Sequence, residues 1–144
     1  MIQYAVLRRT PRLLRWYRTR LTLDWKRLTS YLPTEGRLLD VGCGVGLVDY
    51  EVARARPNMK ILGIDLDDEI IAMAQSYNAA PNVEYKRVDL GCVEGQFDCI
   101  LLVDVCHHGP PDERVALLEA SSALLSDRGY VLIKDIERNG GQIS

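Results

Sequence analysis

Short apolar segments alternate with amphipathic ones along the chain after a polar turn at residues 33–36. The apolar segments have the length of strands, and the segments between them repeat their apolar positions at helical spacing. The expected strands are 37–41, 60–64, 83–88, 97–103 and 130–136, and the expected helices are 47–56, 67–77 and 111–125. Strands that alternate with helices imply right-handed crossovers and a parallel sheet. The sequence therefore predicts an α/β fold with a doubly wound, mainly parallel sheet and helices on both faces.

The first 34 residues follow a different pattern, with leucines and aromatic residues at mixed helical spacing among arginines. Residues 1–30 hold 8 basic side chains and 1 acidic one, a net charge of +7, whereas the remaining residues hold 10 basic and 19 acidic ones, a net charge of −9. We therefore divide the chain into an N-terminal basic amphipathic helical arm, residues 1–34, and a core domain, residues 35–144. The arm is interpreted either as a helix packed on the core or as a helix lying on a membrane surface. Nucleic acid is not an expected partner, because the acidic body would repel phosphates.

The composition is that of a single globular domain. The 144 residues are 47% hydrophobic and 26% charged, which is enough apolar material to bury a core. No apolar run reaches the roughly 18 residues that span a bilayer, and the first ten residues lack the features of an export signal. We therefore expect a cytoplasmic protein.

The four cysteines show neither a pairing pattern nor the spacing of metal ligands; they are Cys43, Cys92, Cys99 and Cys106. We expect reduced, partly buried thiols, and a nucleophilic Cys106 beside His107 is the alternative. No metal site is expected. His107 and His108 are adjacent, and neighbouring side chains on an extended chain point to opposite faces.

A glycine-rich turn follows the first expected strand, at the edge of the sheet where such folds bind their ligands. Gly42, Gly44 and Gly46 have the spacing GxGxG, which allows a tight turn and a close approach of the backbone to a ligand. The turn opens a helix whose first N–H groups face the ligand. The next position is Leu47, where a dinucleotide-binding turn needs a third glycine, so a pyrophosphate would be crowded.

Acidic residues follow the second and third expected strands. Asp65 lies 19 residues after Gly46, where a carboxylate can accept hydrogen bonds from both hydroxyls of a ribose. Asp67 is expected to cap the helix that follows. Asp89 can accept a hydrogen bond from the exocyclic amine of an adenine, and a role in a turn or cap is the alternative.

An acid and two histidines follow the fourth expected strand: Asp104, His107 and His108. Histidine is suited to proton transfer near neutral pH, so either histidine is a candidate base. The alternative is that both are polar loop residues that hydrogen-bond to the backbone or line a pocket.

These blocks resemble the class I S-adenosylmethionine-dependent methyltransferases, in particular the small-molecule type related to quinone-biosynthesis methylases. The likeness covers about residues 35–138 and rests on 38–46, 64–65, 88–90 and 97–108, in the order and spacing of that family. It implies a Rossmann-like fold. The family core adds an antiparallel hairpin after the fifth strand, whereas this chain ends about eight residues past that strand. We therefore expect a core truncated after strand five, without the hairpin, whose exposed apolar edge favours a homo-oligomer.

The resemblance also implies roles for individual residues toward S-adenosyl-L-methionine. The glycine-rich loop would contact the methionine part, the acid before the loop would orient it or meet the amino group, and the later acids would take the ribose and the adenine. Asp104 would lie near the sulfonium, and His107 or His108 would be the catalytic base. The residues expected to bind the cofactor are Asp40, Gly42, Cys43, Gly44, Gly46, Asp65, Leu66, Asp89, Leu90 and Asp104.

The function implied by the resemblance is methyl transfer from S-adenosyl-L-methionine to a small acceptor of a hydrophobic or lipid-like kind. Displacement at an activated methyl group depends mainly on positioning the two reactants. In this family an N-terminal segment often forms a lid over the substrate, which is a third interpretation of the arm. One alternative function is a non-catalytic module that binds S-adenosylmethionine. Another is a dinucleotide-binding oxidoreductase, which Leu47 and Asp89 disfavour.

Overall fold

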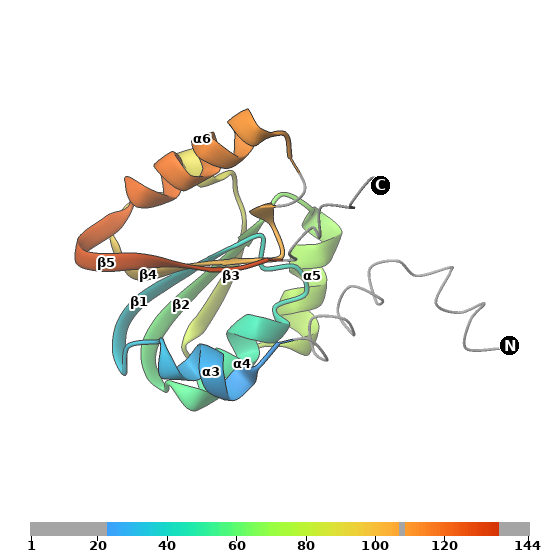
Figure 1. Cartoon of the computed structure of the whole chain (residues 1–144). Helices are drawn as coiled ribbons and strands as arrows, with labels where there is room; N and C mark the ends of the chain where they lie inside the picture. The colour runs from blue at the N-terminus through green and yellow to red at the C-terminus, as the bar shows by residue number, and fades with distance from the viewer. Residues whose placement is uncertain (1–22, 107–108, 136–144) are drawn as a thin grey trace, which may run out of the picture.

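A computed structural model describes residues 23–106 and 109–135, in which a five-stranded sheet forms the centre of the molecule (Figure 1). All of its strand pairs are parallel, and the strand order is β3-β2-β1-β4-β5. The strands are β1 (Glu35–Val41), β2 (Asn58–Asp65), β3 (Val83–Arg87), β4 (Phe97–Val103) and β5 (Leu125–Lys134). The α/β fold and its parallel sheet are therefore confirmed.

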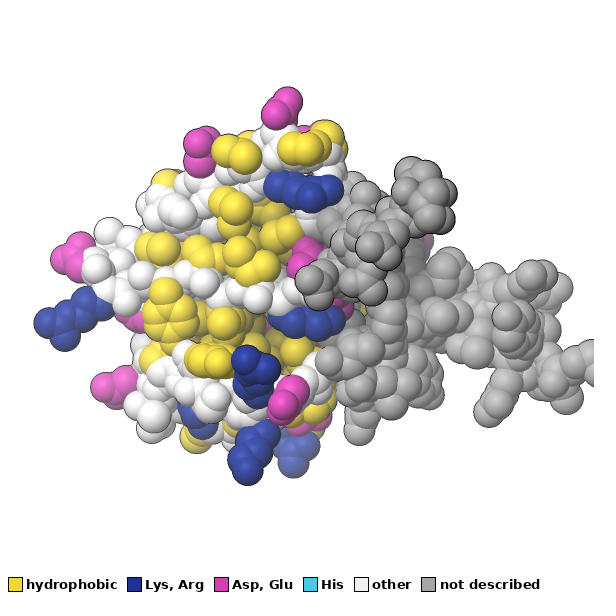
Figure 2. Space-filling view, viewed as in Figure 1, with side chains coloured by type: hydrophobic (Ala, Val, Ile, Leu, Met, Phe, Trp, Pro, Cys, Tyr) yellow, Lys and Arg dark blue, Asp and Glu magenta, His cyan; other side chains and the backbone are white. Residues whose placement is uncertain are grey.

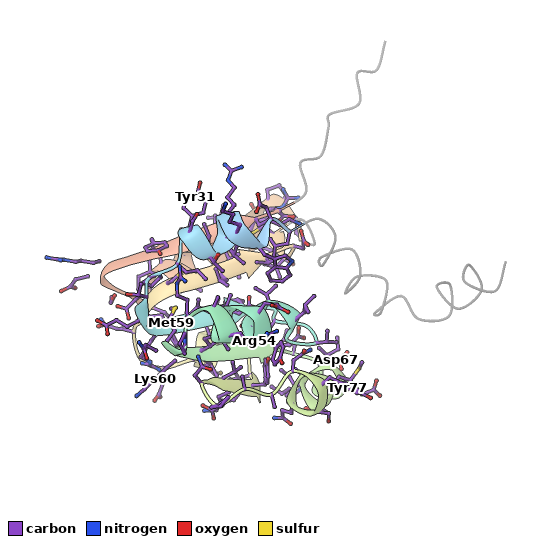
Figure 3. The ribbon with its side chains drawn as sticks, turned by 90° about the horizontal axis from the view of Figure 1, so that it is seen from below. Tyr31, Arg54, Met59, Lys60, Asp67 and Tyr77 are labelled. Carbon is purple, nitrogen blue, oxygen red and sulfur yellow. The ribbon has the colours of Figure 1, made fainter. Side chains whose placement is uncertain are left out.

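Helices cover both faces of the sheet, as the alternation of strands and helices predicts. One face carries α3 (Trp25–Ser30), α4 (Leu47–Ala55) and α5 (Asp68–Tyr77), which lie side by side when the molecule is seen from below (Figure 3). The other face carries α6 (Pro111–Ser122), and a short 3-10 turn, η1 (Leu90–Cys92), connects β3 to β4.

The central strands are buried on both faces because their apolar side chains alternate between two cores. Leu38 on β1 and Leu101 on β4 pack with α3 and α4, whereas Leu39 and Ile100 pack with residues of α6. All four side chains are fully buried. The nearly continuous apolar sequence of β4 is thus explained by its place in the middle of the sheet.

The fifth strand begins earlier than its sequence suggests. The structure starts it at Leu125 rather than at residue 130, and α6 ends at Ser122 rather than at residue 125. Leu125 pairs with Phe97, and regular pairing resumes at Tyr130 opposite Cys99 after an irregularity. Residues 126–129 of β5 stand opposite the single residue Asp98, and a Cβ on Gly129 would lie 2.7 Å from the backbone oxygen of Phe97.

The outer edge of β5 is open within the described residues. No described strand pairs with it, and Tyr130 and Ile133 remain 38% and 48% exposed. Figure 2 shows hydrophobic surface along this side of the sheet. The expected exposed apolar edge is therefore present in the described part of the chain, and self-association through it stays a prediction.

The last part of the arm packs on the core. Asp24 caps α3 by accepting a hydrogen bond of 3.0 Å from the backbone N–H of Arg27, and the Leu28 and Leu32 side chains are buried against the core around α4. Residues 1–22 lie outside the described residues, so the lid and membrane-surface interpretations stay open. Of the helices described, none has the length and apolar character needed to cross a membrane.

Replacing Leu101 by alanine tests the importance of the shared core. The side chain is fully exposed only on unfolding, so Leu101→Ala should lower the free energy of unfolding by about 2 to 5 kcal/mol in a urea titration. Val115→Ala on α6 is the matched control. Because Val115 is 53% exposed, we expect a change within about 0.5 kcal/mol. Equal effects for the two variants would contradict this placement of the core.

Candidate functional site

The glycine-rich loop and Asp104 flank the point where the strand order reverses. The loop follows β1 and Asp104 follows β4, and these two strands are neighbours at the centre of the sheet. The chain leaves β1 and β4 toward opposite faces, which opens a crevice at their carboxyl ends in folds of this type. The fold therefore brings the predicted loop and the predicted acids to one edge of the sheet.

The loop is held in place by the end of β2. The backbone N–H groups of Gly42 and Cys43 both donate to the carbonyl oxygen of Ile64, at 2.8 and 2.9 Å. A carbonyl oxygen has two lone pairs, so it can accept both hydrogen bonds. Gly46 is the N-cap of α4, and the Tyr50 N–H donates to the Gly46 carbonyl oxygen at 3.0 Å.

The three glycines of the loop all have positive φ angles, of 75°, 57° and 78° along the chain, which other residues rarely adopt. A Cβ on Gly42 would lie 2.5 Å from the side chain of Val105, and one on Gly46 would lie 2.5 Å from the Tyr85 hydroxyl. A Cβ on Gly44 would meet nothing within 4 Å. Gly44 therefore faces open space, which leaves its backbone accessible to a ligand.

The Asp65 carboxylate lies beside this open space. Its Oδ2 accepts a hydrogen bond of 3.1 Å from the Gly44 N–H, and its Oδ1 accepts one of 3.1 Å from the Asp67 N–H. An ionised carboxylate has about four acceptor sites, so two more donors can bind. The side chain is partly exposed, so these acceptor sites are accessible.

Asp67 caps α5, as predicted, by accepting from the N–H groups of Glu69 and Ile70 at 2.9 and 3.2 Å. Figure 3 labels Asp67 beside this helix. The cap fixes the chain just after Asp65 and so supports the orientation of that carboxylate.

Asp89 and its neighbours form the edge of the site beyond β3. Oδ1 of Asp89 accepts a hydrogen bond of 2.8 Å from the Gly91 N–H and caps η1, which is the alternative role considered for it. One carboxylate oxygen still has acceptor capacity. Leu66 is 63% exposed beside Asp65, whereas Leu90 is partly buried against the core. The adenine role of Asp89 and Leu90 stays a prediction.

Asp104 lies on the opposite side of the site and pairs with a residue that we did not predict. Its φ angle of 56° lies in the left-handed region, and its N–H donates to the Lys134 carbonyl at 2.8 Å. Lys134 Nζ lies 2.7 Å from Asp104 Oδ1, with both side chains largely buried. Lys134 is the last residue of β5, and its position at a strand end is the signal that could have revealed it.

Two buried acids lie beneath the loop. Asp40 on β1 was predicted, and Asp49 in the first turn of α4 was not; both are fully buried. Burial raises the pKa of Asp40 to about 7 and raises the pKa of Asp49 well above its usual range. Asp49 lies on the helix face of Val52 and Ala53, both buried. An acid at such an apolar position is the signal that could have revealed it.

The four cysteines differ in their exposure. Cys43 and Cys99 are buried and Cys106 is partly buried, as expected, but Cys92 is exposed, and all four thiols are free. Burial raises the pKa of the Cys106 thiol, which disfavours a nucleophilic thiolate there. His107 and His108 lie outside the described residues.

A cavity of about 390 Å³ on the α6 face of the sheet reaches Val88 and Cys92, on either side of Asp89 and Leu90. Its wall includes Arg37, Lys60 and Phe97, near the amino ends of their strands, together with Val93 of the connection that follows η1. None of the predicted cofactor residues lines it. The cavity therefore adjoins the Asp89 edge of the candidate site without including the residues predicted to bind the cofactor.

The profile of a methyltransferase domain family matches residues 13–143. The chain belongs to this family. The resemblance read from the glycine-rich loop and the strand ends is therefore confirmed at the level of the family. The match extends through the core domain and into the N-terminal arm.

Curated methyltransferases are similar to most of this chain. It is 31% identical over 125 residues to the ubiquinone biosynthesis O-methyltransferase of Ralstonia nicotianae. The aligned region covers 83% of this chain and 50% of that protein. It is 29% identical over 111 residues to the protein of the same name from Acinetobacter baumannii. The aligned region covers 72% of this chain and 45% of that protein. The chain thus spans about half the length of these relatives.

Solved methyltransferase structures share the fold. DhpI in complex with SAH superposes with a TM-score of 0.73 at 20% identity, over 90% of this chain and 62% of that one. The plantazolicin methyltransferase BpumL, solved with SAH and a pentazolic desmethylPZN analog, gives a TM-score of 0.69 at 21% identity, over 87% of this chain and 52% of that one. The Rossmann-like methyltransferase fold is therefore confirmed.

Alanine at Gly46 should destabilise this methyltransferase domain much more than alanine at Gly44. The left-handed backbone alone costs about 1 to 2 kcal/mol for a residue with a side chain. At Gly46 the clash with Tyr85 adds about 1 to 3 kcal/mol of overpacking. Urea unfolding of the two variants measures the difference. If Gly46→Ala costs no more than Gly44→Ala, then Tyr85 does not close off the space at Gly46.

Proposed function

We propose that this chain binds S-adenosyl-L-methionine at the carboxyl ends of its strands and transfers the methyl group to a small acceptor. The observation that carries the proposal is the open backbone of Gly44 beside the Asp65 carboxylate. The first provides close contact without a side chain in the way, and the second provides acceptors for a ribose. Family membership and the SAH bound in the similar structures support the same cofactor.

The residues of the loop fit the methionine part of such a cofactor. Gly42, Cys43, Gly44 and Gly46 would present their backbone to it, since the positive φ angles at the glycines bring the chain close to the open space. Asp40 would attract its amino group or hold the loop. When bound, S-adenosyl-L-methionine supplies a methyl group on a sulfonium, activated for in-line displacement.

The adenosine part would lie across the ends of β2 and β3. Asp65 would accept hydrogen bonds from the ribose hydroxyls, with Leu66 covering the ring system beside it. Asp89 would accept from the exocyclic amine through the capacity left after capping η1, and Leu90 would contact the base. Leu66 is 63% exposed, so its side chain is accessible to such a ligand.

The acceptor would approach from the side of Asp104. The Asp104–Lys134 pair would place charge near the methyl group, and His107 or His108 would take the proton of an acceptor that must lose one. The relatives named as ubiquinone biosynthesis O-methyltransferases support an oxygen acceptor on a hydrophobic or lipid-like small molecule. The protein would exclude water and align the two reactants.

A non-catalytic module that binds S-adenosyl-L-methionine is the second candidate. Methyl transfer to a phenolic acceptor, followed with a labelled methyl donor, separates the two functions. Transfer supports the enzyme. Binding without transfer to any phenol tested favours the module.

Asp65→Ala should weaken binding of S-adenosyl-L-methionine and its demethylated product about 10- to 150-fold in calorimetric titration. Hydrogen bonds to a charged group contribute about 1.5 to 3 kcal/mol, which corresponds to that loss. Asp68→Ala is the control, since it removes an exposed acid from the first turn of α5 that pairs with Arg87 at 3.6 Å. We expect the wild type to bind both compounds and not NAD. Unchanged affinity in a folded Asp65→Ala protein would remove Asp65 from the site.

A further inference from the structure

Asp49 is a buried acid that lies beside a second buried acid, Asp40. Asp49 and Asp40 are 0% and 2% exposed, and Asp40 is the partner in the sheet of Gly63, beside which Asp49 lies. No N–H or O–H group of the described residues donates to either oxygen of Asp49 or to Oδ1 of Asp40. Asp49 Oδ2 lies 2.7 Å from the place a Cβ on Gly63 would take, so the glycine makes room for it.

The other groups that face this pair carry no positive charge. They are Asp65 at the end of β2, Cys43 in the loop and Tyr85 on β3. Within the described part of the chain, no lysine or arginine acts on either carboxyl group. The Tyr85 hydroxyl is directed to the carbonyl oxygens of Gly46 and Asn78, at 3.1 and 2.8 Å. The pair therefore depends on a proton of its own.

The position of that proton follows from the chemistry of the two groups. An ionised carboxylate only accepts hydrogen bonds, so a bond between two carboxyl groups requires a proton on one of them. Burial raises the pKa of both acids. Within the described residues both buried oxygens of Asp49 lack a donor, whereas only Oδ1 of Asp40 does, so a negative charge is less costly on Asp40. Asp49 is therefore the donor and Asp40 the acceptor.

We propose that Asp49 acts as a permanently protonated positioning residue, which donates a hydrogen bond to Asp40 and so readies the loop and its acid for a cationic ligand. The pair spans the loop, because Asp40 comes two residues before Gly42 and Asp49 three residues after Gly46. This inference rests on the proposed function, in which the ligand is the cationic S-adenosyl-L-methionine.

The proposal predicts how cofactor affinity depends on pH. A cation above the loop favours the ionised form of Asp40. The pKa of Asp40 is about 7, so affinity should fall as pH drops below 7, where binding must release the Asp40 proton to solvent. Affinity should level off above 7, where Asp40 is already ionised while Asp49 keeps its proton.

Two substitutions of Asp49 separate a hydrogen-bond donor from a space-filling side chain. Asp49→Asn keeps a neutral donor of the same shape, so the pH midpoint of cofactor affinity should stay near that of the wild type. Asp49→Leu keeps the volume but removes the donor, which should raise the midpoint by about one pH unit. Glu51→Gln on the same helix is the control for loss of an acid that does not face the pair.

Infrared spectroscopy of the free protein tests the proton directly. At pH 8 the wild type should show the C=O band of a protonated buried carboxyl group, and Asp49→Asn should lose it. An absent band in the wild type, or a midpoint in Asp49→Leu equal to that of the wild type, would overturn the proposal. If Asp49→Leu does not fold, the infrared band and the pH midpoint of Asp49→Asn still test the proposal. A wild type that shows the band but binds no cofactor would sink the proposed function and leave the proton assignment standing.

Discussion

The backbone junction between the loop and β2 is the contact on which the rest of the site depends. The carbonyl of Ile64 holds two consecutive N–H groups, those of Gly42 and Cys43, and the next residue along β2 is Asp65. One short stretch of backbone therefore fixes both the path of the loop and the position from which the Asp65 side chain projects. The hydrogen bond from the Gly44 N–H to Asp65 then closes this arrangement from the other side.

Much of the fold could be predicted because its signals are local. The apolar period of each segment identified the strands, and the acid before α5 identified its cap at Asp67. The start of β5 could not be predicted in this way. Leu125 enters the sheet by pairing with Phe97, a contact between segments distant in the chain, while the sequence around residue 127 reads as a turn.

The residues of the candidate site likewise divide into those with a local signal in the sequence and those that depend on distant strands. The glycine-rich loop and Asp65 carry spacing that a single sequence reveals, and the structure brings them together. Asp49 and Lys134 depend on what other strands place around them. Asp49 is buried because Gly63 leaves a space beneath the loop, and Lys134 becomes a partner of Asp104 only when β4 and β5 end side by side.

The irregular pairing in β5 limits what its open edge can accept. Five consecutive pairs, from Cys99 with Tyr130 to Val103 with Lys134, follow a regular register, whereas the preceding segment bulges around Gly129. A bulge twists a strand and interrupts the row of hydrogen-bonding groups that a neighbour would need. The edge can therefore template only a short added strand near the carboxyl end of β5. Residues 125–129 offer no regular row of this kind.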